Sequence, residues 1–197
     1  DSGQVGVHAG AITSAADLVE LRVTGPGGHT ARPERTIDLV AALGRLITGM
    51  QPALDRLTPR PGDLHLVFGA VHAGDAPNVI PSHGLVRGSL RTRDHGVWED
   101  APRLVERAVE ELLEGTGAAW TMQHRRGVPP VVNDPAMTAL LAMTAARVLG
   151  DDAVVGTDQS LGGDSFAWFL ERVPGCYVRL GVHDPRSTGP RLDLHAH

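Results

Sequence analysis

The sequence contains no lysine, and all 18 of its basic residues are arginine. We interpret this bias as codon usage of a GC-rich genome. Acidic residues number 23, so the formal net charge is −5. A nucleic-acid-binding protein should carry a basic excess instead. The charge balance therefore argues against nucleic acid as a partner.

Cysteine is nearly absent, and the single Cys176 excludes a disulfide framework. No apolar run approaches the ~18 residues of a membrane span, and no basic-then-apolar start resembles a signal peptide. We therefore expect a cytoplasmic protein with no membrane partner. The 197 residues, 42% of them hydrophobic, suffice for one large domain or two small ones and argue against disorder.

The two ends of the sequence predict a fragment. The chain begins Asp-Ser-Gly without methionine, and it ends Leu-His-Ala-His without a helix stop or a polar tail. Residues 1–17 are small, polar and rich in glycine, and we expect a linker or an irregular strand there.

Residues 18–126 predict a compact α+β domain. Alternating hydrophobicity indicates strands, and apolar residues at helical spacing indicate helices. The expected strands are 18–24, 64–71, 84–93 and 118–124, and the expected helices are 37–54 and 98–114. The order β-α-β-β-α-β is that of the ferredoxin-like split βαβ unit, with four antiparallel strands and two helices on one face.

Residues 127–197 resemble the remainder of a larger α/β domain. After a Pro/Gly hinge at 127–130, Asp134 and Pro135 predict the start of a helix that ends at Leu149. A short helix over 164–172 and a strand over 176–182 are expected after a polar loop. This segment carries too little apolar surface to stand alone.

His29 lies in the glycine-rich loop Gly25-Pro-Gly-Gly-His29, which we expect to lack regular structure. It is either an exposed loop histidine or a hydrogen-bond donor to a carbonyl oxygen that becomes an oxyanion. The three glycines allow backbone angles that would present the imidazole at the apex of the loop.

Asn78 and Arg91 are the next candidates. Taken alone, Asn78 is expected to be a turn residue and Arg91 a solvated arginine on a strand. Together they offer an amide donor and a guanidinium fork, which suit a carboxylate.

The C-terminal part adds weaker candidates. His195 could be a metal ligand, and His197 could be a second donor or part of a tag. The segment Gly162-Gly-Asp-Ser165 could be a backbone loop near a ligand, or Asp164 could cap the following helix. No P-loop, zinc-finger spacing, nucleophile elbow or dinucleotide fingerprint is present.

Eight short motifs in one order resemble the dinuclear metallopeptidases that include aminoacylases, carboxypeptidases and succinyl-diaminopimelate desuccinylases. The resemblance covers nearly the whole chain and is greatest to the hippurate hydrolase and N-acyl-amino-acid amidohydrolase branch. The motifs are Thr24-Gly-Pro-Gly-Gly-His-Thr-Ala-Arg-Pro33, Thr36-Ile-Asp38, Asn78-Val-Ile-Pro81, Gly88-Ser-Leu-Arg91, Val132-Asn-Asp134, Gly163-Asp-Ser-Phe166, Val173-Pro-Gly175 and Leu194-His195.

The resemblance implies an α/β catalytic domain with an inserted ferredoxin-like lid that also pairs two subunits. The lid would be residues 18–126, with 1–17 and 127–197 belonging to the catalytic domain. Family members hold two divalent ions, zinc or manganese, and a glutamate base activates a bridging water for attack on an amide carbonyl. The other metal ligands and the paired glutamates of the family are not in this chain, so we expect the chain alone to be inactive.

The resemblance also assigns residues. His195 matches a metal ligand, and His29 matches the lid histidine that reaches into the partner subunit's site. Asn78 and Arg91 match positions that hold the substrate carboxylate, and Gly163 lies in a substrate loop. This loop departs from the family pattern, because Gly163 is followed by Asp-Ser where Glu-Asp is usual.

The first functional hypothesis is therefore a metal-dependent amidohydrolase, acting as a homodimer on small N-acyl amino acids or peptides. The second is a non-catalytic ferredoxin-like module for dimerisation or ligand binding, because fold alone does not decide function. A third is an N-carbamoyl-amino-acid hydrolase of the same architecture.

Overall fold

The computed structural model describes residues 1–184 and 186. These residues form two compact units. Unit 1 contains 1–12, 131–160 and the residues from Phe166 onward, and unit 2 contains 13–130 and 161–165. Among the described helices, none combines the length and apolar character needed to cross a bilayer.

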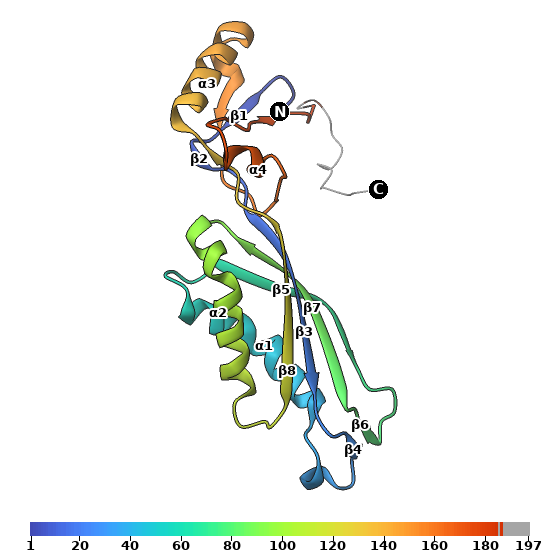
Figure 1. The fold of residues 1–197 in the computed structure, drawn as a ribbon. Coiled ribbons are helices and arrows are strands. Elements are labelled where there is room, and N and C mark those ends of the chain that lie inside the picture. Colours follow the sequence, from blue (N-terminus) through green and yellow to red (C-terminus); the bar gives the residue numbers. More distant parts are fainter. Residues whose placement is uncertain (185, 187–197) are drawn as a thin grey trace. The chain divides into compact units, whose positions relative to one another are not determined.

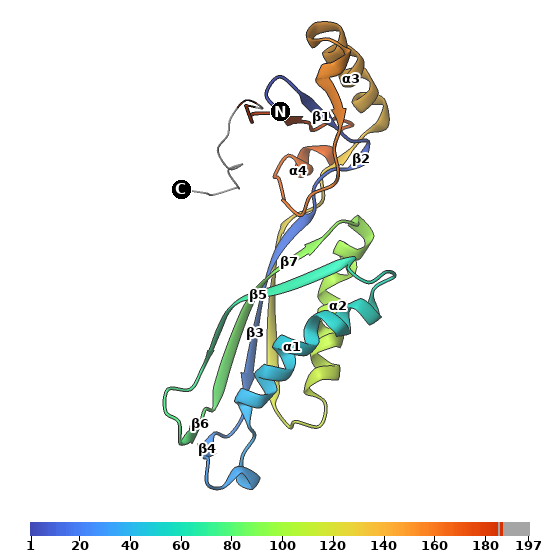
Figure 2. The ribbon, with the colours of Figure 1, turned by 180° about the vertical axis from the view of Figure 1, so that it is seen from behind.

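Unit 2 is built on a four-stranded antiparallel sheet with the strand order β5-β7-β3-β8. Figures 1 and 2 show helices α1 and α2 on one face of this sheet, which leaves the other face without helices. The elements are β3 (Ala15–Thr24), α1 (Leu39–Leu57), β5 (Leu64–Ala73), β7 (His83–Thr92), α2 (His95–Leu113) and β8 (Ala119–Val128). This is the element order that the sequence predicts for this segment.

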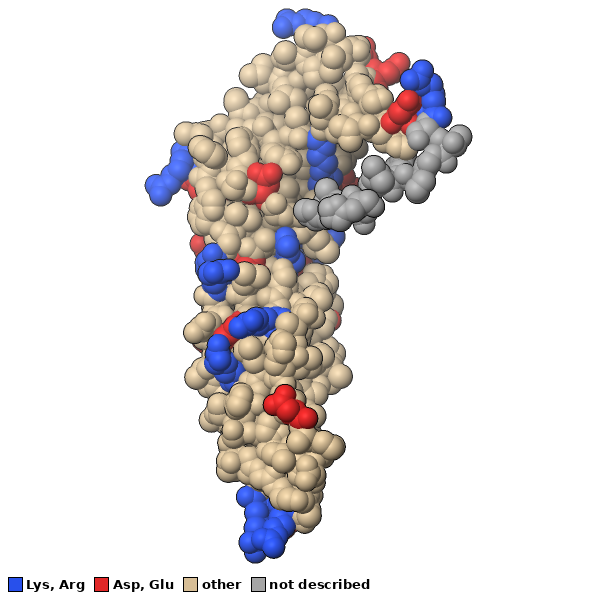
Figure 3. Space-filling model, turned by 90° about the vertical axis from the view of Figure 1, so that its right-hand side faces the viewer, with Lys and Arg blue, Asp and Glu red and all other residues tan. Residues whose placement is uncertain are grey.

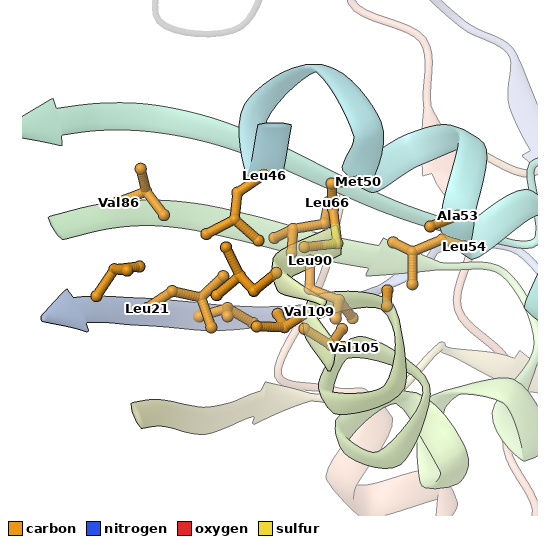
Figure 4. Close-up of a cluster of buried hydrophobic side chains, with 14 of the residues drawn as sticks. Leu21, Leu46, Met50, Ala53, Leu54, Leu66, Val86, Leu90, Val105 and Val109 are labelled. Atoms are coloured by element: carbon orange, nitrogen blue, oxygen red, sulfur yellow. The ribbon is translucent and has the colours of Figure 1, made fainter. Parts of the chain in front are cut away.

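The core of unit 2 lies between the sheet and the two helices. Alternate residues of β3 point inward, so that Val19, Leu21 and Val23 are buried while the residues between them face the helix-free side. Leu46 and Met50 of α1 and Val105 and Val109 of α2 belong to the same buried cluster as these strand residues (Figure 4). Burying such side chains stabilises the fold by roughly 1.5–3 kcal/mol each.

Aspartates begin both helices of unit 2. The Asp38 carboxylate accepts a hydrogen bond from Ala41 N (3.0 Å), and that of Asp94 accepts one from Val97 N (2.9 Å). Each carboxylate satisfies an N–H that has no partner within the helix. These caps explain why the helices begin at Leu39 and His95 rather than at 37 and 98.

A short ladder extends one end of unit 2. β4 (Gly28–His29) pairs antiparallel with β6 (Val79–Ile80), beyond the end of β3 (Figure 1). A 3-10 turn follows at Pro33–Arg35. The expectation that the glycine-rich loop lacks regular structure is therefore wrong at His29, because β6 supplies a pairing partner from a distant segment.

The described residues of unit 1 form two small sheets, two α-helices and a 3-10 turn at Asp151–Ala153. β1 (Val5–Val7) pairs parallel with β10 (Val154–Gly156) and antiparallel with β11 (Arg179–Leu180), and β2 (Gly10–Ala11) pairs with β9 (Val132–Asn133). The Asp134 carboxylate caps α3 (Pro135–Leu149), as the sequence predicts. A small core of Ile12, Val131 and Ala167 holds α4 (Ala167–Leu170).

Several local expectations are wrong. Of the two alternatives for residues 1–17, the irregular strand is confirmed and the linker is wrong, because β1 and β2 pair with strands from the C-terminal part of the chain. β8 extends into the expected hinge and ends at Val128. The helix expected at 164–172 shortens to α4, and Asp164 does not cap it, because the residue preceding the first turn is Phe166. The strand expected at 176–182 shortens to two residues.

Candidate functional site

His29 and Asn78 lie side by side at the end of unit 2. His29 is paired with Val79 in the β4–β6 ladder. The Asn78 carbonyl accepts hydrogen bonds from Thr30 N (3.2 Å) and Thr30 Oγ1 (3.3 Å). Both candidate side chains are exposed, so both are accessible to a ligand at this end of the sheet.

One glycine of the loop shapes the backbone before His29. Gly27 has φ of +68°, and a Cβ there would lie 3.2 Å from the carbonyl oxygen of Ile80. Gly25 and Gly28 do not adopt positive φ. The sequence argument that three glycines need unusual angles therefore applies at Gly27 alone.

The His29 ring is held by its own turn. Arg32 N donates to the His29 carbonyl (2.9 Å), and Ala31 N donates to His29 Nδ1 (3.0 Å). Sequence reasoning identified the histidine but not Thr30 and Ala31, the residues that hold the turn. The two backbone N–H groups of these residues donate whatever the side chain is, so for those bonds residue type gives no signal; only the Thr30 hydroxyl contact depends on residue type.

Arg91 and Gly163 lie together at the opposite end of the same sheet. Arg91 is half-buried, its Nε donates to Ser89 Oγ (3.2 Å) and its Nη1 donates to the Leu161 carbonyl (3.3 Å). A Cβ on Gly163 would lie 2.9 Å from Ala16 Cβ and 3.5 Å from Arg91 Nη1. Only glycine therefore brings this loop so close to the guanidinium without displacing a neighbour.

The structure separates Arg91 from Asn78. Arg91 pairs with Ala16 at the start of β3, whereas the β4–β6 ladder lies beyond Thr24 at its end. Eight residue steps of a strand span about 26 Å. A small substrate therefore cannot contact Asn78 and Arg91 of the same chain at once.

The helix-free face of the sheet is rich in arginine. Glu20 lies between Arg22 and Arg87, with an N···O distance of 2.6 Å to each. The Arg87 guanidinium, followed by that of Arg22, lowers the pKa of Glu20 below its ordinary value. Figure 3 faces this side and shows basic side chains beside an acidic one midway along it. Arg91 and Arg125 add further positive charge, so the face favours anionic ligands.

Asp17 forms a buried polar cluster that sequence reasoning missed. Its carboxylate accepts hydrogen bonds from His124 Nε2 (2.7 Å), Gly127 N (2.9 Å) and Trp98 Nε1 (3.0 Å). Burial by itself raises the pKa of Asp17, but the three donors outweigh it and lower the pKa below its ordinary value. A signal was present, because Asp17 occupies an inward position of the β3 alternation.

The predicted metal ligand His195 and the neighbouring His197 lie outside the described residues. Within residues 1–184 and 186, no group of three or more His, Cys, Asp or Glu side chains could hold a metal ion. The described residues therefore do not by themselves provide a dinuclear centre.

Three comparisons place the chain among known proteins. The N-acetylcysteine deacetylase of Bacillus subtilis (strain 168) is 32% identical over 181 residues, which cover 92% of this chain and 47% of that protein. A putative glutamate–cysteine ligase 2-3 of Rhodococcus jostii (strain RHA1) is 42% identical over 193 residues, but these cover only 24% of that protein. This chain thus spans half or less of the length of these relatives.

The chain is also similar to solved structures. The Bacillus subtilis YXEP protein, described as a dinuclear metal binding peptidase from the M20 family, matches 89% of this chain and 43% of its own, with a TM-score of 0.72 and 28% identity. A putative aminohydrolase from Staphylococcus aureus has a TM-score of 0.84 over 95% of this chain and 48% of its own. At 20% identity, this second likeness shows the fold alone.

A family model described as Peptidase family M20/M25/M40 matches residues 3–194. Of the motifs that suggested this resemblance, all but Leu194-His195 fall within the described residues. This chain therefore belongs to peptidase family M20/M25/M40.

Proposed function

We propose that this chain is the lid and C-terminal part of a metal-dependent amidohydrolase that cleaves the amide bond of N-acyl amino acids or small peptides. The acting protein would be a homodimer with two divalent metal ions, zinc or manganese, in each full-length subunit. When bound, those ions would supply an activated water and polarise the amide carbonyl. His195 is the one ligand that we assign to this chain.

The observation that carries the proposal is the division of the candidate residues into two groups. His29 and Asn78 lie at one end of the sheet, and Arg91 and Gly163 lie at the other, about 26 Å away by strand geometry. One small substrate can meet both groups only if they come from different subunits. We therefore assign Arg91 to one subunit and His29 with Asn78 to its partner at each site.

The roles follow from the chemistry of each group. Among the described residues, Arg91 Nη2 has no recorded partner, so it can donate to a substrate carboxylate while Ser89 and Leu161 hold the rest of the guanidinium. His29 would donate to the carbonyl oxygen of the scissile amide as negative charge develops there. The basic helix-free face would attract the anionic substrate.

The proposed homodimer is supported by an apolar flank beside an edge strand. Gln51 Nε2 of α1 donates to the Leu64 carbonyl of β5 (3.0 Å), so this flank of α1 lies over β5, an edge of the sheet. Val40 and Ile47 on the same flank are 55% and 41% exposed. An unpaired edge beside exposed apolar residues favours pairing across a two-fold axis.

Complementation between two impaired variants of the full-length protein tests this proposal. The variants are His29→Ala and Arg91→Ala, assayed separately and after mixing at substrate concentrations below KM. If His29 acts across the dimer, each heterodimer has one site with both residues intact, and statistical mixing restores about one quarter of the wild-type rate. No recovery, after subunit exchange has been verified, would contradict the shared site.

The substrate class needs its own assay. We expect turnover of hippurate or N-acetyl amino acids, with N-acetylcysteine included because a relative is named for it. Turnover of N-carbamoyl amino acids alone would favour the carbamoyl hydrolase hypothesis. Absence of all turnover by the full-length, metal-loaded protein would favour a non-catalytic module. The 197-residue chain alone, with added zinc or manganese, should show no turnover above a metal-only blank.

A further inference from the structure

The turn at residues 29–32 is held from two sides. Within the turn, Arg32 N donates to the His29 carbonyl at 2.9 Å. From outside the turn, the Asn78 carbonyl accepts hydrogen bonds from both the N–H and the hydroxyl of Thr30. The main chain around His29 is thus constrained although its side chain is exposed.

Inside this turn, the Ala31 N–H points at a ring nitrogen. The distance from Ala31 N to His29 Nδ1 is 3.0 Å. A main-chain N–H can only donate, so Nδ1 must present its lone pair and cannot carry a proton. In a neutral imidazole the proton then lies on Nε2.

We propose that the main-chain N–H of Ala31 is a positioning group for His29, which it fixes as the Nε2–H tautomer. Because the two ring nitrogens lie on opposite sides of the imidazole, the same bond directs Nε2–H away from the turn. The bond also restricts rotation of an exposed side chain. Ordering the ring in advance reduces the entropy that a ligand would otherwise have to offset.

This tautomer decides among three roles that a histidine can have. A general base or a metal ligand needs an available lone pair, and here Nδ1 is occupied while Nε2 is protonated. A hydrogen-bond donor needs an outward N–H, which Nε2 supplies. Resting on the proposed function, the inference names His29 Nε2–H as the atom that meets the carbonyl oxygen of the substrate.

Nitrogen-15 NMR on the 197-residue chain tests the inference without any catalytic assay. We expect Nε2 of neutral His29 to be protonated and Nδ1 to be unprotonated. We also expect a scalar coupling across the hydrogen bond between the Ala31 amide nitrogen and His29 Nδ1.

Replacing Ala31 by lactate exchanges only the amide N–H for an ester oxygen. This variant tests whether the Ala31 N–H sets the His29 tautomer. The ester should abolish the coupling and shift His29 toward the tautomer ratio of His72, an exposed imidazole on β5 that serves as the reference. Ala31→Gly retains the N–H and should leave the Nδ1 signal unchanged. The inference is overturned by a protonated Nδ1 in the wild-type chain, or by an ester variant whose tautomer ratio is unchanged.

A kinetic comparison in the full-length protein separates this inference from the proposed function. The ester variant should lower kcat more than it raises KM. If the full-length protein proves inactive on every acyl amino acid, the proposed function fails, and the NMR result still decides whether Ala31 sets the tautomer.

Discussion

The carboxylate of Asp17 and the imidazole of His124 form a buried pair, with Oδ2 and Nε2 2.7 Å apart. The two side chains are 0% and 7% exposed. Trp98 of α2 donates to the same carboxylate, so the pair joins the sheet to a helix. The third donor is Gly127 N, next to a register shift in the β3–β8 ladder.

This cluster predicts a pH-dependent contribution to stability. Because the pKa of Asp17 is lowered in the folded state, the carboxylate stabilises the fold above its unfolded pKa of about 3.9. That contribution is lost as pH falls through the lower folded pKa. Asp17→Asn should cost about 3 kcal/mol at pH 7, because the buried donors lose a charged acceptor.

Urea unfolding of wild type and Asp17→Asn at several pH values checks this prediction. The difference in unfolding free energy should shrink as pH falls below about 4. Asp75→Asn, at an exposed loop position, is the control, and it should change stability little. A difference that persisted undiminished in acid would contradict the assigned role of the charge.

The two ends of the sheet should respond differently to mutation in the full-length protein. His29→Ala should lower kcat by roughly 100- to 1000-fold, since an oxyanion donor acts mainly in the transition state. Its cost in stability should stay below about 0.5 kcal/mol, because the side chain is exposed. Arg91→Ala should mainly raise KM for substrates with a free carboxylate.

Steady-state kinetics beside thermal unfolding distinguishes these effects. Near-normal turnover by His29→Ala, or turnover lost only through unfolding, would remove His29 from the proposed site. For Arg91→Ala, an amide or ester analogue that lacks the free carboxylate is the control substrate. Its KM should be nearly the same for wild type and variant.

The flank of α1 over β5 predicts which mutations dissociate the dimer. Ile47→Glu places a charge among exposed apolar residues beside the edge strand, and it should shift the chain to monomer at micromolar concentration. Arg45→Glu on the opposite flank of α1 should leave the mass unchanged. Light scattering of both variants and of wild type measures the molar mass in solution. A wild-type chain that is strictly monomeric would exclude self-association by this route.

Two glycines of unit 2 should behave in opposite ways. A Cβ on Gly127 would clash with the carbonyl oxygen of Ala16, so Gly127→Ala must distort the β3–β8 ladder and destabilise the fold. A Cβ on Gly44, in the interior of α1, would meet nothing within 4 Å. Gly44→Ala should therefore stabilise the helix by up to about 1 kcal/mol. Melting temperatures of the two variants, compared with wild type, give the sign of each effect.

The order of helices and strands in unit 2 could be predicted from the sequence because it depends on local periodicity. Val19, Leu21 and Val23 alternate at strand spacing, and Leu39, Leu43, Leu46 and Met50 recur at helical spacing. Asp134 followed by Pro135 likewise marks a helix start through contacts within one turn. Such signals involve neighbours in the chain and need no tertiary information.

Residue types also indicated His29, Asn78, Arg91 and Gly163 as candidates, but their grouping depended on the tertiary structure. Strand register places Arg91 opposite Ala16, whereas a pairing between β4 and β6 places His29 beside Val79. These pairs join segments that are far apart in the chain, and no local pattern specifies them. The tertiary fold therefore decided that the candidate residues form two groups, and that two subunits are required if they act on one small substrate.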